Sequence, residues 1–172
     1  MRVLIATASR HGATREIGDR IAVAIREGFR RHSIGDEVLV QDCDDVDAVA
    51  DYDAVVLGSA VYMGRWLKSA RILAEREFSE LETRPVWLFS SGPLGDSNKE
   101  PPKGKWDKAS WALEHRVFGG KIDRAVLSRR ERLVVTLIKA ANEDDRCWSD
   151  IDAWADHICT HLTALARQTA VN

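Results

Sequence analysis

Residues 7–14 read Thr7-Ala8-Ser9-Arg10-His11-Gly12-Ala13-Thr14, and they join a predicted strand to a predicted helix. The apolar run Arg2–Ala6 before them is typical of a buried strand. The segment Thr14–Arg31 after them has its apolar residues at helical spacing, on a face made of Ile17, Ile21, Ala24, Ile25 and Phe29. A strand that turns directly into a long amphipathic helix indicates an α/β fold.

The turn itself carries hydrogen-bond donors for an anion. Backbone N–H groups at the start of a helix point toward a ligand, Ser9 and Thr14 add hydroxyl groups, and Gly12 permits close approach. A terminal phosphate needs this combination. The turn contains neither the Gly-Lys-Ser/Thr of a Walker A loop nor the Gly-x-Gly-x-x-Gly of a dinucleotide site. In the alternative interpretation, Ser9 or Thr14 only caps the helix.

Strand and helix signals alternate along the rest of the chain. Further strands are predicted at Glu37–Gln41, Asp53–Gly58, Pro85–Phe89 and Arg116–Phe118, and helices at Asp44–Ala50, Leu67–Leu81, Arg129–Ala141 and Ser149–Arg167. These elements predict a three-layer α/β sandwich, with a five-stranded parallel sheet in the order 2-1-3-4-5 and helices on both faces. Ligands of such sheets bind at the carboxyl ends of the strands, so the loops after the first, third and fourth strands are expected to build one site.

Two loops complete this expected site. The loop after the third strand begins at Gly58, where a ligand can approach closely, and its candidate binding residues are Ser59, Ala60, Val61, Tyr62, Met63 and Gly64. Tyr62 and Trp66 either border a flat aromatic ring or pack against the helix that follows. The loop after the fourth strand contributes Ser90, Ser91, Gly92, Pro93 and Leu94, with an ordinary turn as the alternative.

Composition limits the class of protein. The chain of 172 residues fits one domain spanning residues 1–172, and 45% hydrophobic residues are enough for a buried core. The net charge of −2 gives no sign of a nucleic-acid-binding protein. The three cysteines lie far apart, the chain starts directly in a strand, and no apolar run is long enough to span a bilayer. We therefore expect a cytoplasmic protein.

Two longer motifs carry a family resemblance. The first is Ala8-Ser9-Arg10-His11-Gly12-Ala13-Thr14-Arg15-Glu16-Ile17, and the second is the segment Asp53–Gly64. The chain resembles the flavodoxin superfamily and, within it, the menaquinone-dependent protoporphyrinogen oxidase type. The segment Arg129–Lys139 and the sequence Trp148-Ser149-Asp150 add weaker support. The first two motifs are specific for the superfamily, whereas only the whole set indicates the subfamily.

The resemblance implies a flavodoxin-like fold that binds FMN without a covalent bond. The phosphate of FMN is expected at Ser9, Arg10, His11, Gly12, Ala13 and Thr14. The isoalloxazine ring is expected between the loops Ser59–Gly64 and Ser90–Leu94. His11 stands where the family often has a hydroxyl or an acid, and it either contacts the phosphate or points into solvent.

Three functions stay open from the sequence. The first is an FMN-dependent oxidoreductase, a dehydrogenase or oxidase similar to menaquinone-dependent protoporphyrinogen dehydrogenase, with the chemistry on the flavin and no catalytic side chain assigned. The second is a flavodoxin-type electron carrier between redox proteins, for which an acidic face near the ring is expected. The third is a binding module, or a protein that takes a deazaflavin instead.

Three outlying features have two interpretations each. A basic, aromatic loop contains Lys99, Lys103, Lys105, Lys108, Trp106 and Trp111. It either binds a flat acidic substrate or is an ordinary solvated loop. The helix Arg129–Ala141 either lies on a membrane surface, near a quinone, or packs on the sheet. His157 and His161 have the spacing of metal ligands, but no third ligand is evident, so no metal is expected. The expected partner is a small molecule or a quinone, with peripheral membrane contact and a homodimer left open.

Overall fold

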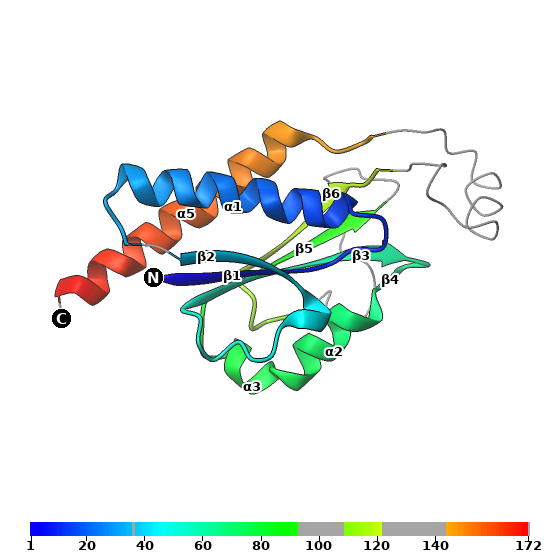
Figure 1. Cartoon of the computed structure of the whole chain (residues 1–172), viewed down its shortest axis with the longest axis horizontal. Coiled ribbons are helices and arrows are strands. Elements are labelled where there is room, and N and C mark those ends of the chain that lie inside the picture. The colour runs from blue at the N-terminus through cyan, green and yellow to red at the C-terminus, as the bar shows by residue number, and fades with distance from the viewer. Residues whose placement is uncertain (36, 93–108, 122–143, 172) are drawn as a thin grey trace.

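The computed structural model describes residues 1–35, 37–92, 109–121 and 144–171. Its sheet contains five parallel strands in the order β2-β1-β3-β5-β6, as Figure 1 shows. The bounds are β1 Arg2–Ala8, β2 Glu37–Asp42, β3 Ala54–Tyr62, β5 Val86–Gly92 and β6 Glu114–Gly119. A two-residue strand, β4 (Arg65–Trp66), pairs antiparallel with the end of β3. The parallel sheet and its strand order, as predicted from the sequence, are confirmed.

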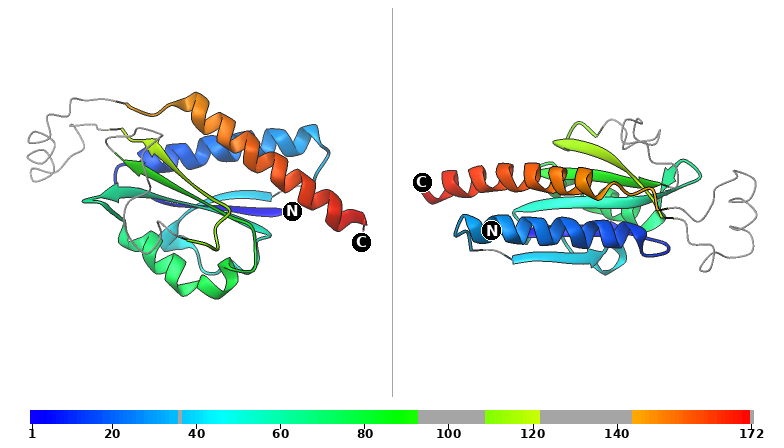
Figure 2. Two further views of the ribbon diagram at one scale, coloured as in Figure 1. Left: turned by 180° about the vertical axis from the view of Figure 1, so that it is seen from behind. Right: turned by 90° about the horizontal axis from the view of Figure 1, so that it is seen from above.

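Helices cover both faces of the sheet. The long helices α1 (Ala13–Arg31) and α5 (Trp148–Val171) lie side by side on one face, and α2 (Lys68–Arg76) and α3 (Phe78–Leu81) lie on the other (Figures 1 and 2). Alternation along the buried strands separates the two cores, because successive side chains of a strand point to opposite faces. Val3 and Ile5 belong to the core beneath α1 and α5, and Leu4 belongs to the core beneath α2. The expected three-layer sandwich is confirmed.

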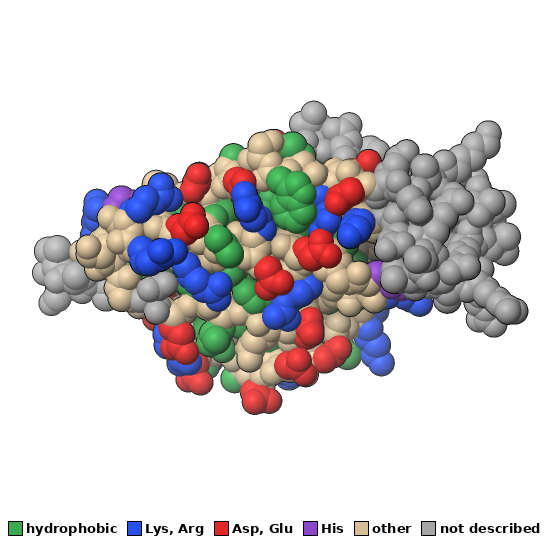
Figure 3. All heavy atoms as spheres, turned by 45° about the horizontal axis from the view of Figure 1, so that its top comes forward, with side chains coloured by type: hydrophobic (Ala, Val, Ile, Leu, Met, Phe, Trp, Pro, Cys, Tyr) green, Lys and Arg blue, Asp and Glu red, His purple; other side chains and the backbone are tan. Residues whose placement is uncertain are grey.

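The outer face of α1 and α5 carries acidic and basic side chains next to one another (Figure 3). Arg20 forms a two-pronged ion pair with Asp152, at 2.6 and 2.7 Å, and Arg31 lies 3.7 Å from Asp156. These pairs tie the two helices together above a groove whose lining includes the half-exposed Val23. The groove is lined only by residues of α1 and α5 and therefore lies away from the loops at the carboxyl ends of the strands.

Two helix predictions are wrong in part. The predicted helix Leu67–Leu81 is broken at Glu77, whose φ of −98° and ψ of 15° end α2 before α3 begins. The Glu77 carboxylate accepts a hydrogen bond from the buried N–H of Val49 at 3.1 Å, and the side chain of Phe78 is exposed. The predicted helix Asp44–Ala50 is only a short 3₁₀ turn at Cys43–Asp45. The apolar spacing there imitates a helix because Val46 and Val49 both bury their side chains from an irregular segment.

Strands β3 and β5 extend beyond their predicted ends. Residues 59–62, expected in a loop, continue β3, and residues 90–92 continue β5. The strands are prolonged because they pair with each other there, Ser59 with Ser90 and Ala60 with Ser91. Small polar residues therefore do not end a strand whose neighbour offers a matching ladder. Strand β6 is likewise longer than the predicted Arg116–Phe118.

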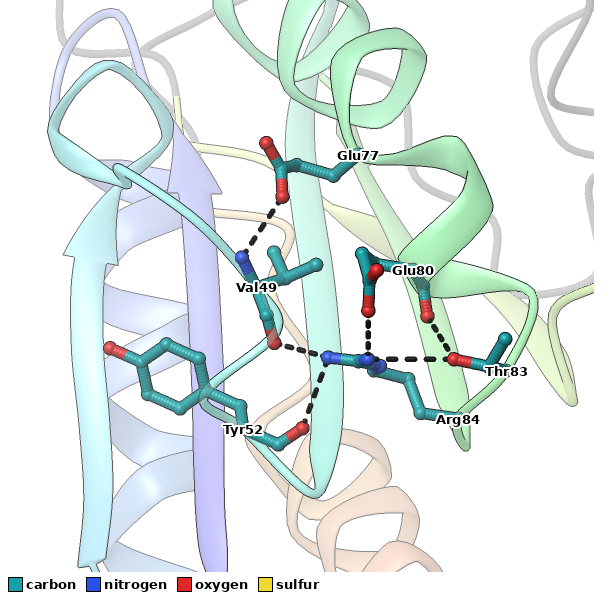
Figure 4. Close-up of polar contacts among 6 residues, drawn as sticks. All are labelled: Val49, Tyr52, Glu77, Glu80, Thr83 and Arg84. Atoms are coloured by element: carbon teal, nitrogen blue, oxygen red, sulfur yellow. Dashed lines mark hydrogen bonds and ion pairs between the residues drawn. The ribbon is translucent and has the colours of Figure 1, made fainter.

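A polar cluster stabilises the end of the sheet at which strands β3 and β5 begin. The Arg84 guanidinium donates to the backbone oxygens of Val49 and Tyr52 and to the Glu80 carboxylate at 2.6 Å (Figure 4). Its side chain is only 11% exposed. The cluster joins the chain that enters β3 to the chain that enters β5, because Tyr52 and Arg84 stand just before these strands.

Several predictions fall outside the described residues. They concern the helix Arg129–Ala141, the lysines of the basic loop, Pro93 and Leu94. The chain leaves the described part at Lys121 and re-enters it at Asp144, and these two residues form an antiparallel bridge. Within the described part, no helix combines the length and the apolar character that a bilayer crossing demands. A single domain over residues 1–172 stays a prediction.

Candidate functional site

The register of the sheet brings the three predicted binding segments together. Ala8 of β1 pairs with Ser59 of β3, and Ser59 pairs with Ser90 of β5. The turn after β1, the end of β3 and the end of β5 therefore lie along one edge, at the carboxyl ends of the strands. This edge lies toward the end of Figure 1 at which α1 begins and the β4 hairpin projects.

The turn after β1 leads into a helix that has no side-chain cap. Gly12 is the N-cap residue of α1, with a left-handed φ of 87°, and no side chain caps the helix. The first N–H groups of a helix have no partner within it, so those of α1 are left for other acceptors. The alternative in which Ser9 or Thr14 caps this helix is therefore wrong.

One hydroxyl of the turn is buried and unpaired. Ser9 Oγ is shielded from solvent and has no hydrogen-bond partner, and the same holds for Thr7 Oγ1 two residues earlier. Thr14 is buried in the first turn of α1, whereas Arg10 and His11 are exposed. Buried polar groups are nearly always paired in folded proteins, so an unpaired hydroxyl beside an uncapped helix indicates a missing acceptor.

The end of β3 forms a hairpin with β4. Met63 and Gly64 make its turn with φ values of 51° and 72°, the left-handed conformation that tight two-residue hairpin turns require. Met63 is 86% exposed, and Tyr62 is also exposed. The Arg10 guanidinium lies 4.8 Å from the centre of the Tyr62 ring, a cation–π contact that connects this hairpin to the turn after β1.

Trp66 and Gly58 do not border the site. Trp66 is 4% exposed and donates from Nε1 to Ser90 Oγ at 2.8 Å, so the packing interpretation holds for this residue. Gly58 was expected to admit a ligand. A Cβ atom there would lie 2.0 Å from the Phe89 ring, so the close neighbour of Gly58 is a core side chain instead.

The predicted serines of β3 and β5 hold the strands in place. Ser59 Oγ donates to the Ala60 carbonyl at 2.9 Å and accepts from the Leu67 N–H at 3.0 Å. Ser90 Oγ accepts from Trp66 and lies 2.9 Å from His115 Nε2. Ser59, Ser90 and Ser91 are buried. At this edge, β3 and β5 therefore offer backbone groups and exposed hairpin side chains to a ligand, while their serine hydroxyls serve the fold.

Sequence reasoning missed Arg146, which lies against the first turn of α1. Its guanidinium donates to Glu16 Oε2 at 2.5 Å and forms two bonds to the Asp144 carboxylate, at 2.7 and 2.6 Å. Only 3% of its side chain is exposed, and the guanidinium covers the Trp148 ring at 4.5 Å. The hydrogen bond from Arg146 lowers the pKa of Asp144, and the reverse interaction raises the pKa of Arg146. No local pattern distinguishes this arginine from a solvated one.

The remaining candidates lie apart from this edge. His157 and His161 are both exposed on α5, and His161 contacts the Trp87 ring edge-on, with 5.4 Å between the ring centres. Across the described ranges, no group of three His, Cys, Asp or Glu side chains is placed to hold a metal. Burial raises the pKa of Cys43 to about 12, so its thiol stays protonated.

Comparison with known structures agrees with this fold. A single-residue mutant of flavodoxin from Pseudomonas aeruginosa has a TM-score of 0.58 at 13% identity over 93% of this chain and 97% of that one. Two-electron reduced flavodoxin from Megasphaera elsdenii has a TM-score of 0.52 at 20% identity, over 67% of this chain and 84% of that one. Identities this low support the fold alone.

A larger protein shares the fold in part. Rubredoxin:oxygen oxidoreductase from the anaerobe Desulfovibrio gigas has a TM-score of 0.58 at 14% identity and covers 95% of this chain. The chain spans only 36% of that oxidoreductase. No curated protein sequence matches the chain. The sequence model of the flavodoxin domain family matches residues 4–147, most of the chain's length. The chain therefore belongs to the flavodoxin domain family.

Proposed function

We propose that the chain binds FMN, with the phosphate at residues 9–14 and the flavin ring between the β3–β4 hairpin and the end of β5. The observation that carries this proposal is the uncapped start of α1 beside the unpaired, buried Ser9 Oγ. A dianionic phosphate supplies the acceptors that these donors need, and the positive end of the helix dipole favours it. Family membership supports the same cofactor.

Each part of the edge has a task in this proposal. Ser9 donates its hydroxyl to the phosphate, and the first N–H groups of α1 donate to the other phosphate oxygens. Gly12 turns the chain so that these groups converge. Tyr62, steadied by Arg10, gives the ring an aromatic neighbour. Bound FMN would supply the hydride and electron transfer.

The reaction that we propose is that of an FMN-dependent oxidoreductase. The whole set of motifs resembles the menaquinone-dependent protoporphyrinogen oxidase type, and this resemblance supports a porphyrinogen as electron donor and a quinone as acceptor. A second candidate is an electron carrier. The exposed aspartates Asp42, Asp44 and Asp45 follow β2 on the carboxyl-end side of the sheet, and they favour it because an acidic surface on that side suits docking to a basic redox protein.

Titration with FMN tests the binding proposal. Absorption spectra of the purified protein should show a bound flavin, and Ser9→Ala should weaken FMN binding by about tenfold to 100-fold, the loss expected for a hydrogen bond to a charged group. Riboflavin, which has no phosphate, should bind both proteins equally. The control is Ser79→Ala on α3, at the other end of the sheet. The proposal is wrong if FMN and riboflavin bind the wild type alike.

Stepwise anaerobic reduction of the FMN-loaded protein separates the two functions. An oxidoreductase of this type should take up two electrons together and should transfer them from a porphyrinogen to a menaquinone analogue. A carrier should take up the electrons one at a time and show no turnover of either small molecule. The second result would exclude the dehydrogenase while leaving FMN binding intact.

A further inference from the structure

Arg146 connects the first turn of α1 to Asp144 and, through Asp144, to Lys121. Its Nη1 atom bonds the Glu16 carboxylate at 2.5 Å and lies 3.5 Å from the Ala13 carbonyl oxygen, so the guanidinium lies along the first helical turn. On its other side it holds Asp144, which is bridged to Lys121 at the end of the sheet. Among the described residues, Arg146 is the only buried arginine.

The two carboxylates that Arg146 contacts would repel an anionic ligand if no positive charge lay between them. Glu16 lies in the first turn of α1 and Asp144 lies close to it, so two carboxylates stand next to the proposed phosphate position. One helical turn rises by about 5.4 Å, which is shorter than the screening length of about 8 Å at physiological salt. A dianion bound at residues 9–14 is therefore within reach of both negative charges.

We infer that Arg146 is a positioning residue for the phosphate end of the site. Its single positive charge offsets one of the two negative charges of Glu16 and Asp144, and it fixes the first turn of α1 so that its N–H groups converge on one anion. The inference rests on the proposed FMN site. It assigns to Arg146 a role in distinguishing a phosphorylated flavin from an unphosphorylated one, although its guanidinium is fully engaged by carboxylates and does not bind the ligand itself.

Affinities for FMN and riboflavin test this role, because a merely structural defect lowers both. For Arg146→Met we expect FMN to bind about tenfold more weakly, because two carboxylates lose their counter-charge, while riboflavin changes less than about threefold. Adding salt should reduce this difference by screening the carboxylates. Arg146→Lys should fall between wild type and Arg146→Met, because lysine keeps the charge but not the forked geometry.

Substitution of Glu16 tests whether negative charge at the first turn of α1 weakens FMN binding. Glu16→Gln removes one negative charge and keeps a hydrogen-bond acceptor for Arg146, so it should strengthen FMN binding and leave riboflavin unchanged. The double variant Glu16→Gln with Arg146→Met should regain part of the FMN affinity that Arg146→Met loses. If Arg146→Met does not fold, Arg146→Lys and Glu16→Gln alone decide the question. The matched control is Arg20→Met, which removes an exposed α1–α5 ion pair and should leave the FMN-to-riboflavin ratio unchanged.

The outcomes separate the inference from the proposed function. A wild type that binds FMN no better than riboflavin overturns the FMN site and the inference with it. If wild type prefers FMN but every Arg146 and Glu16 variant keeps the same preference, the FMN site stands and the role of Arg146 is wrong. Equal weakening of both flavins by Arg146→Met also overturns the inference, because it indicates general damage to the fold.

Discussion

Gly12 has a left-handed backbone at the point where β1 turns into α1, with a φ of 87°. A Cβ atom there would meet no other atom within 4 Å, so the conformation alone requires glycine. We predict that Gly12→Ala lowers the free energy of unfolding by about 1–2 kcal/mol, the cost of a left-handed backbone with a side chain. Gly35→Ala is the control, because it has equal space and no positive φ, and it should change stability by less than about 0.5 kcal/mol. Urea unfolding measures both, and equal losses would contradict the prediction.

Single residues also show where sequence reasoning ends. Ser9 and Gly12 were predicted as parts of the site because a strand–turn–helix pattern is local, and the structure places both in the turn between β1 and α1. Whether Trp66 packs or borders the site was left open, because its position depends on a hydrogen bond to Ser90, which comes from another strand. Arg146 was missed because its partner Glu16 lies 130 positions away. Contacts of this range leave no periodic signal in a single sequence.

The polar cluster around Arg84 connects elements that are distant in the chain. Because its guanidinium holds two backbone carbonyls and the Glu80 carboxylate, Arg84→Met removes these three hydrogen bonds, and the Val49 carbonyl keeps only the one from the Tyr52 N–H. We predict a loss of about 2–4 kcal/mol in the free energy of unfolding, within the range for breaking a largely buried polar network. Arg71→Met, the same change at an exposed position of α2, should cost less than about 0.5 kcal/mol. FMN affinity should not change in either variant, since this corner lies at the opposite end of the strands.

Elements were predicted well where burial is continuous and poorly where pairing decides their length. The parallel strands were predicted from buried apolar runs such as Ala54–Leu57, and their order from the alternation of strands and helices. The ends of β3 and β5 were not predicted, because their serines are typical of a loop and only the pairing of the two strands shows that both continue. The break between α2 and α3 was also missed, since it depends on a hydrogen bond from Val49 to Glu77.

Arg146 joins the chain before α5 to α1 through Glu16 and also pairs with Asp144, so the titration of Asp144 affects a contact between distant parts of the molecule. Arg146 lowers the pKa of Asp144 in the folded protein, and the folded state therefore binds fewer protons than the unfolded state near pH 4. Its contribution is complete above the ordinary aspartate pKa of about 3.9 and is lost as the pH falls below that value. Because Asp144 is partly exposed, solvent screening keeps the effect small.

Unfolding by urea between about pH 6 and pH 3 measures this contribution. The wild type should lose more stability over this range than Asp144→Asn, whose amide does not titrate. The exposed Asp47→Asn serves as control and should follow the wild type. Parallel pH curves for wild type and Asp144→Asn would show that the pair does not contribute to folding.

The bridge between Lys121 and Asp144, together with the bond from the Asp145 N–H to the Gly120 carbonyl at 3.0 Å, brings the chain that leaves β6 beside the chain that enters α5. A connection of any length between these two points starts and ends at neighbouring positions. Insertions or deletions within this connection are therefore compatible with the same pairing of β6 and the same start of α5, because added loop length raises the entropic cost of closing a loop only slowly.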